Sequence, residues 1–292
     1  MQSPLEVGEE TDMRPVQPVL VAHLFPDVYA ALLDLLGGLT DAEWAAPTVC
    51  AGWSVHDVAL HLWGGDVGNL SRRRDTYNDP VATVSVDFSR RDELLAFINR
   101  FNNGWVEATR RVSPPVLCDS LRLTGPQIAA YFAGLDASAI GAPVSWAGPD
   151  PAPVWLDIAR EYTERWLHQQ QIRDAVGKPG LKEPRFFSPL LDTFVRALPH
   201  ALRHVEAPEG TSVHLAITGN AGGEWFAARA GQRWLLAAET DTPPIATVAM
   251  DQETAWRLFT KGLTREDALP RITRDGDPKV TDAMLGMVSI IA

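Results

Sequence analysis

Three residues on two predicted helices have the chemistry and the spacing of a metal site. Glu164 and His168 are four positions apart, so on an α-helix they lie about 40° apart on one face. A carboxylate oxygen and a neutral imidazole nitrogen suit zinc, and a third ligand from a facing helix leaves one coordination position open for water or substrate. His61, on a separate predicted helix, is the third ligand that we expect. Ordinary structural readings stay open, because exposed Glu and His pairs at this spacing contribute only a few tenths of a kcal/mol to a helix.

The helix that carries His61 gives independent support. Gly65, Gly68 and Arg72 follow His61 at intervals of 4, 7 and 11 residues, within about 40° of its direction. Glycines inside a helix cost about 0.8–1 kcal/mol each relative to alanine. Together with Gly64 they indicate space for a cofactor and substrate beside the metal, close helix packing, or a broken helix. Arg72 is the predicted substrate anchor, since guanidinium groups bind carboxylates in a bidentate manner, although the run SRRRD is also typical of a solvated surface.

Other histidines and the cysteines fit a site less well. His56 is rotated about 140° from His61 on a regular helix, so both cannot face one ion. His200 and His204 share a helix face, but only Glu206 offers a nearby carboxylate. Cys50 and Cys118 have no basic or histidine neighbour in sequence, and we expect both to be small buried apolar residues.

Composition excludes several classes of protein. The 292 residues carry a net charge of −11, and without a concentrated basic run this argues against nucleic-acid binding. Two cysteines cannot form a disulfide framework, which favours a reducing cytoplasm. The acidic N-terminus resembles no secretory signal, and no run of 18 apolar residues predicts a membrane span. HExxH, GxSxG, GxxxxGK[ST] and GxGxxG motifs are absent, which argues against peptidase, esterase, kinase and dinucleotide-binding functions.

Hydrophobic spacing divides the chain into two predicted domains, 15–180 and 185–292, of an α+β protein. The first repeats apolar residues every three to four positions, which predicts a bundle of about four long helices. The second alternates strand-like segments with turn residues, which predicts a small antiparallel sheet with flanking helices. The predicted helices of the first domain cover about 25–38, 54–75, 91–112, 126–136 and 154–177, and Pro114-Pro115 ends the third. The predicted strands of the second cover about 211–218, 224–230, 232–239 and 244–250, with a short one near 271–277.

Two segments resemble a known family. PTVCAGWSVHDVALHLWGGDVGNLSRRRD and REYTERWLHQQQIRDAVG are similar to the mycothiol-dependent maleylpyruvate isomerase family, within the DinB-like metal-binding four-helix bundles. The second domain looks like the sterol-carrier-protein-like domain that often follows this bundle. The resemblance also makes His61, Glu164 and His168 the metal ligands. It further implies that the second domain can contribute an arginine, for which Arg257, Arg265 and Arg271 are candidates.

The resemblance implies an actinobacterial enzyme that uses mycothiol, a small thiol, as cofactor or co-substrate. Zinc favours the thiolate form of a bound thiol at neutral pH. The thiolate could add to an electron-poor double bond, which permits cis-trans isomerisation, or it could take part in thiol transfer or exchange. The partners expected are small electrophilic or anionic molecules. Two alternatives remain: a ligand-binding protein with a vestigial metal site, and a hydrolase in which zinc activates water.

Overall fold

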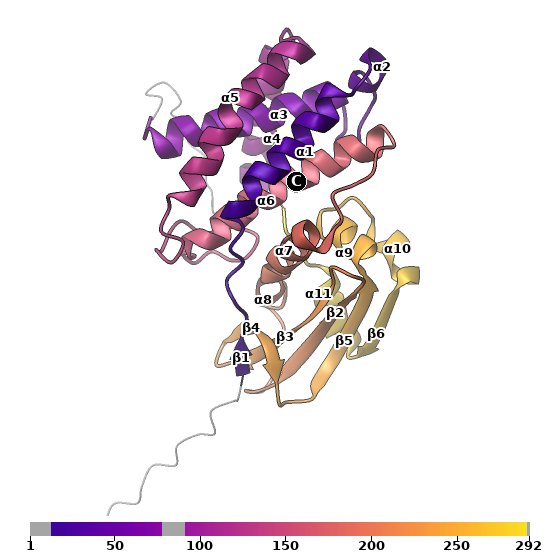
Figure 1. Ribbon diagram of the computed structural model, residues 1–292. Coiled ribbons are helices and arrows are strands. Elements are labelled where there is room, and N and C mark those ends of the chain that lie inside the picture. The colour runs from indigo at the N-terminus through magenta and orange to yellow at the C-terminus, as the bar shows by residue number, and fades with distance from the viewer. Residues whose placement is uncertain (1–12, 78–90, 291–292) are drawn as a thin grey trace, which may run out of the picture. The chain divides into compact units, whose positions relative to one another are not determined.

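The structure, a computed structural model, describes residues 13–77 and 91–290. These residues form two compact units. The helical unit contains Val19–Val144 and Asp150–Thr193, and the sheet unit contains the chain up to Pro18, Ser145–Pro149 and Phe194–Ile290. The predicted α+β class is confirmed (Figure 1). None of the described helices combines the length and hydropathy that a membrane span needs.

The third helix, α3 (Val55–Asn69), is the centre of the helical unit, because it contacts α4 (Arg91–Thr109), α5 (Pro114–Ala133) and α6 (Val154–Ala175). Its interior residues Val58 and Leu60 pack with Leu117 and Leu121 in one hydrophobic cluster. The helices of this unit are α1 (Phe25–Gly37), α2 (Asp41–Trp44), α3 (Val55–Asn69), α4 (Arg91–Thr109), α5 (Pro114–Ala133), α6 (Val154–Ala175) and α7 (Pro184–Phe194). A π-helical turn, Leu70–Arg74, continues α3.

The start of α3 is set by a capping box. The Ser54 hydroxyl accepts from the Asp57 backbone N–H, and the Asp57 carboxylate accepts from the Ser54 backbone N–H. Arg110 on the chain after α4 also pairs with Asp57, at 2.8 Å. His61 lies seven residues after Ser54, two turns into a helix that runs unbroken through its glycines. The cap therefore sets the start of the helix that carries His61.

The short helix predicted over 126–136 is in fact the second half of a longer helix that begins at Pro114. The chain leaves α4 at Thr109, and Pro114 begins α5, which continues through Pro126 to Ala133. Proline at the first helical position has no N–H to lose and a pre-set φ, so Pro114 favours a helix start there. The helical unit consequently contains, among its described residues, five helices of 13 residues or more rather than four.

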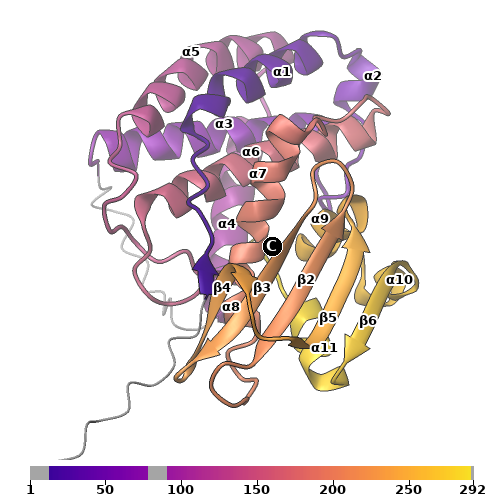
Figure 2. The ribbon, with the colours of Figure 1, turned by 60° about the horizontal axis from the view of Figure 1, so that its bottom comes forward.

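The sheet unit is built on a six-stranded mixed sheet in the order β1-β4-β3-β2-β5-β6 (Figure 2). Its strands are β1 (Met13–Pro15), β2 (Ser212–Thr218), β3 (Gly223–Ala230), β4 (Arg233–Thr240), β5 (Pro244–Asp251) and β6 (Ile272–Gly276). Val213, Leu215 and Ile217 alternate as buried residues along β2. Helices α8 (Leu198–Ala201), α9 (Gln252–Phe259) and α11 (Pro278–Leu285) pack on these strands, and the short α10 covers Arg265–Ala268.

The prediction of an antiparallel sheet is wrong for one pair of strands. β5 pairs in parallel with β2, with Leu215 opposite Val248, instead of forming a hairpin with β4. Alternating hydrophobicity identifies strands and their buried faces, but it carries no information about which strand is the neighbour. The strand Met13–Pro15, which pairs with β4, was also not predicted.

Candidate metal centre

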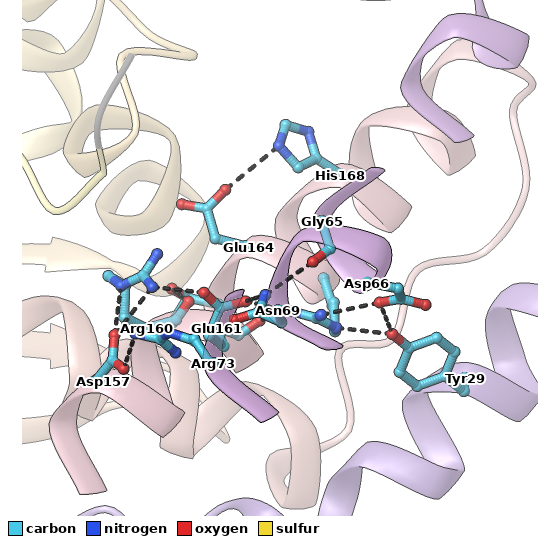
Figure 3. Close-up of polar contacts among 12 residues, drawn as sticks. Tyr29, Gly65, Asp66, Asn69, Arg73, Asp157, Arg160, Glu161, Glu164 and His168 are labelled. Carbon is cyan, nitrogen blue, oxygen red and sulfur yellow. Dashed lines mark hydrogen bonds and ion pairs between the residues drawn. The ribbon is translucent and has the colours of Figure 1, made fainter. Parts of the chain in front are cut away.

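The three predicted ligands come together between α3 and α6. One ligand atom from each of His61, Glu164 and His168 lies within 4.8 Å of the others. The rings of His61 and His168 are 4.7 Å apart and nearly perpendicular. His168 Nε2 lies 3.5 Å from Glu164 Oε2, the contact drawn in Figure 3. Two imidazoles and a carboxylate at this separation can converge on one cation and leave a coordination position open.

Burial favours the neutral, metal-binding form of His61. Desolvation, followed by the neighbouring His168, lowers the pKa of His61 to about 3. Burial also lowers the pKa of His168, but Cys50 and the Glu164 carboxylate outweigh it and raise that pKa to about 10. In the absence of a cation, the triad therefore combines an imidazole whose neutral form is favoured with one whose protonated form is favoured.

A second layer of contacts orients His168. Its Nδ1 lies 2.8 Å from Gln171 Oε1, and Cys50 Sγ donates to the same oxygen at 3.2 Å. With two donors on Oε1, the amide of Gln171 is fixed, and Nδ1 of His168 carries the proton. His168 Nε2 is then the atom that can bind a metal, as second-layer acceptors commonly arrange.

Replacing Gln171 by leucine is expected to weaken zinc affinity about 10- to 100-fold, because partners of this kind typically contribute that much. Gln171→Glu restores an acceptor for Nδ1 and should retain the affinity. Competition with a chromogenic chelator measures both variants. Equal affinity of the leucine variant and the unmodified protein would contradict the orienting role.

The triad opens into a cavity of about 910 Å³ within the helical unit. Its wall includes Cys50, Trp53, His61, Gly65, Phe101 and His168. The ring of Trp53 is 5.1 Å from that of His61. Its volume lies within the range of about 300–1,000 Å³ that is common for sites that bind small molecules.

The glycines of α3 have three different roles. A Cβ on Gly64 would lie 2.5 Å from Trp105 Nε1, so Gly64 permits close packing of α4. A Cβ on Gly65 would meet nothing within 4 Å, and Gly65 lines the cavity. A Cβ on Gly68 would lie 3.1 Å from Arg72 Nη2, so Gly68 makes room for that side chain. Open space and close packing, two of the alternatives left by the sequence, therefore both occur, and the third, a broken helix, does not.

We expect Gly65→Ala to stabilise the protein by about 0.8–1 kcal/mol through helix propensity, while its methyl group reduces ligand binding in the cavity. Gly104→Ala on α4 is the matched control: nothing lies within 4 Å of its Cβ and it does not line the cavity. Gly64→Ala should instead cost about 1–3 kcal/mol, because its methyl group meets the indole of Trp105. Urea unfolding and ligand titration distinguish the three variants. A Gly65→Ala variant that binds ligand like Gly104→Ala would contradict the assignment.

Four arginines line the cavity, and three of them are paired with carboxylates. Arg165 donates to Asp66 at 2.9 Å and to Glu161 at 2.7 Å. Arg160 and Arg73 both pair with Asp157, as Figure 3 shows. Each of these three guanidinium groups is thereby paired with at least one carboxylate.

Arg72, the fourth arginine, differs. Its guanidinium carbon lies 5.5 Å from the centre of the Phe101 ring, and Nε lies 3.4 Å from the Gly68 carbonyl. Across residues 13–77 and 91–290 no carboxylate pairs with it. Arg72 lines the same cavity as His61, so its charge is available to an anionic ligand.

Other sequence predictions have mixed outcomes. His56 bonds to the Val112 carbonyl at 2.9 Å and lies outside the triad, as predicted. Among the described residues, the triad is the single group of three or more histidine, cysteine or acidic residues that could hold a metal ion. His200 and His204 do not belong to such a group. The prediction for Cys50 is wrong, because its thiol is half-buried in the cavity wall and bonds to Gln171. Sequence reasoning also missed Gln171, whose signal was its position three residues after His168.

These features define a helical unit with a candidate three-ligand metal centre, joined in sequence to an α+β unit. Residues 25–173 match the family model described as the mycothiol maleylpyruvate isomerase N-terminal domain. That match covers just over half of the chain, and the chain belongs to this family. The family expected from the sequence is thus confirmed.

Two solved structures align with this chain at low sequence identity. A crystal structure of the mycothiol-dependent maleylpyruvate isomerase aligns with 11% identity and a TM-score of 0.48, over 82% of this chain and 86% of that chain. Sterol carrier protein 2 like 2 from Aedes aegypti aligns with 18% identity and a TM-score of 0.26, over 34% of this chain and 95% of that chain. No curated protein matches significantly.

Proposed function

We propose that this protein is a metal-dependent enzyme that activates mycothiol for reaction with a small electrophilic or anionic substrate, as a cis-trans isomerase or a thiol S-transferase. The observation that carries the proposal is the convergence of His61, Glu164 and His168 at the wall of a large cavity. Membership in a family named for mycothiol chemistry supports the choice of thiol.

The residues present fit a zinc ion. Two imidazole nitrogens and one carboxylate oxygen form the donor set of many catalytic zinc sites, and Gln171 keeps His168 Nε2 available. A bound zinc ion would supply Lewis acidity that favours the thiolate form of a thiol at neutral pH. His61 and His168 would hold the ion from two helices, and Glu164 would offset part of its charge.

The rest of the cavity would position the substrate. Gly65 leaves space beside the triad, and the aromatic rings of Trp53 and Phe101 give part of the wall an apolar surface. Arg72 would hold an anionic group, since its guanidinium lies within the cavity wall without a carboxylate partner among the described residues. Isomerisation and S-transfer both need these functions.

Turnover tests the proposal directly. Protein from zinc-supplemented cells is analysed for metal and then given activated alkenes and mycothiol thioethers or disulfides, with and without mycothiol. About one equivalent of zinc and mycothiol-dependent turnover are expected. Metal-dependent hydrolysis that ignores mycothiol would favour a hydrolase, and protein without bound metal would favour a ligand-binding protein.

For Arg72→Ala we expect KM for an anionic substrate to rise about tenfold or more, because a hydrogen bond to a charged group contributes about 1.5–3 kcal/mol. Zinc content should not change. Arg74→Ala is the matched control, since Arg74 pairs with the adjacent Asp75 and does not line the cavity. Steady-state kinetics measure KM for both variants. Equal KM values for Arg72→Ala and Arg74→Ala would contradict the role of Arg72.

A further inference from the structure

Asn69, the last residue of α3, is a buried polar residue in the wall of the cavity. Only 7% of the surface of Asn69 is exposed to solvent. The amide nitrogen Nδ2 donates to the Gly65 carbonyl at 2.9 Å and to Glu161 Oε2 at 3.0 Å. Figure 3 shows Asn69 between these two partners.

The two contacts decide which atom of Asn69 a ligand can use. A carboxamide nitrogen has two N–H groups, and both partners here are oxygen atoms that can only accept. The orientation of the amide is therefore fixed, and its donors are used. Its oxygen Oδ1 receives no hydrogen bond from the residues that the structure describes. Asn69 thus offers the cavity a hydrogen-bond acceptor.

The position of this acceptor relates it to the triad. His61, Gly65 and Asn69 follow one another at intervals of four residues, so they share one face of α3. All three line the cavity. Gly65, between the other two, has no side chain and nothing within 4 Å of its Cβ position, so it leaves space for a ligand that extends from the triad toward Asn69.

The carboxylates near Asn69 already accept hydrogen bonds from other side chains. Glu161 Oε2 accepts from Asn69 and Arg165, and Oε1 accepts from Arg160. Asp66 accepts from Arg165, Tyr29 and Thr124. Both carboxylates are thus paired with a buried arginine, whereas the neutral Oδ1 of Asn69 accepts no hydrogen bond from the described residues.

We propose that Asn69 is a specificity-determining residue that selects thiol ligands carrying an N–H or O–H donor in the chain beyond the sulfur. This inference rests on the proposed function, because it assumes that the sulfur is held at His61, Glu164 and His168. A thiol with a donor gains a hydrogen bond at Oδ1, while an otherwise identical thiol without one leaves that oxygen desolvated and unpaired.

Matched pairs of thiols test the proposal on the whole protein loaded with Co²⁺. N-acetylcysteamine is compared with 2-mercaptoethyl acetate, in which an ester oxygen replaces the N–H, and 3-mercaptopropan-1-ol with its methyl ether. Homologues of the first pair with three methylene groups instead of two are also tested, in case the distance from the sulfur to Asn69 Oδ1 requires a longer chain. Dissociation constants come from the thiolate-to-cobalt absorbance band. For at least one pair, the donor-bearing thiol is expected to bind about three- to tenfold more tightly, the range of a single neutral hydrogen bond.

Two variants locate the effect. In Asn69→Ser the shorter hydroxyl can bond to the Gly65 carbonyl, as serine often does with the carbonyl four residues earlier, so the acceptor is withdrawn from the cavity. Asn69→Ala removes the acceptor entirely. Both should bind the two members of a pair equally while keeping their Co²⁺ spectrum. If neither variant folds, the comparison of thiols on the unmodified protein still decides the matter.

The outcomes separate the inference from the proposed function. Equal constants within every pair, or a preference that persists in the variants, would overturn the role of Asn69 alone. Absence of a thiolate band with every thiol would overturn the proposed function, and the role of Asn69 with it.

Discussion

Replacing His61 by alanine is expected to abolish stoichiometric metal binding while the helical unit stays folded. Glu164 and His168 remain as two donors on one helix, but the donor from α3 is lost. Loss of a ligand should cost more than the 10- to 100-fold typical of second-layer partners, so we expect zinc affinity to fall by at least about 100-fold. Because its pKa is lowered to about 3, His61 is neutral at pH 7. Its removal therefore leaves no buried charge without a partner, and the fold should be retained.

His56→Ala is the control for this variant. His56 lies on the same helix, bonds to the Val112 carbonyl and contacts Trp44 edge-on, away from the triad. Metal analysis and chelator competition should distinguish the two variants, with circular dichroism as the check on folding. Full zinc occupancy with unchanged affinity in His61→Ala would refute the metal centre.

Replacing Arg165 by methionine is expected to destabilise the protein by about 3–5 kcal/mol, the cost of leaving buried charges without their partner. The Arg165 guanidinium is 5% exposed and donates to Tyr29, Asp66 and Glu161. Urea unfolding followed by tryptophan fluorescence measures the loss. Arg122→Met is the control, because Arg122 forms only an exposed pair with Asp119, and its effect should be within about 0.5 kcal/mol.

The loss in Arg165→Met should depend on pH with a definite sign. Burial raises the pKa of Asp66 even beside Arg165, and removing the guanidinium raises it further. A carboxyl whose pKa is higher in the folded state destabilises that state above its unfolded pKa of about 4. The deficit should therefore be present at high pH and shrink as the pH falls toward about 4. Asp66→Asn should recover part of the loss in the double variant, and a deficit that grew in acid would contradict this account.

Part of the candidate metal site follows from helical periodicity. Glu164 and His168 share a face of α6 because they are four residues apart, whereas the approach of His61 depends on the packing of α3 against α6. The termination of α6 was equally local, since Gly177 adopts a positive φ of 65° directly after the helix.

What could not be predicted depends on partners that are distant in sequence. Cys50 reaches Gln171 across 121 positions, and Arg165 reaches Asp66 across 99. The close contact of Gly64 with Trp105 and the parallel pairing of β5 with β2 likewise involve separate elements. Periodicity describes one element at a time, so it cannot identify such contacts.

The wide turn after α3 has an evolutionary consequence. In Leu70–Arg74 the backbone N–H of Asp75 bonds to the Leu70 carbonyl, five residues back instead of four, which equals one inserted residue in an ordinary helix. Arg72 and Arg73 both reach the cavity from this turn. Loss of a single codon there would restore normal winding and redirect an arginine while α3 itself stayed intact. A descendant of this gene could thus change which arginine faces the cavity in one mutational step, without altering His61, Glu164 or His168.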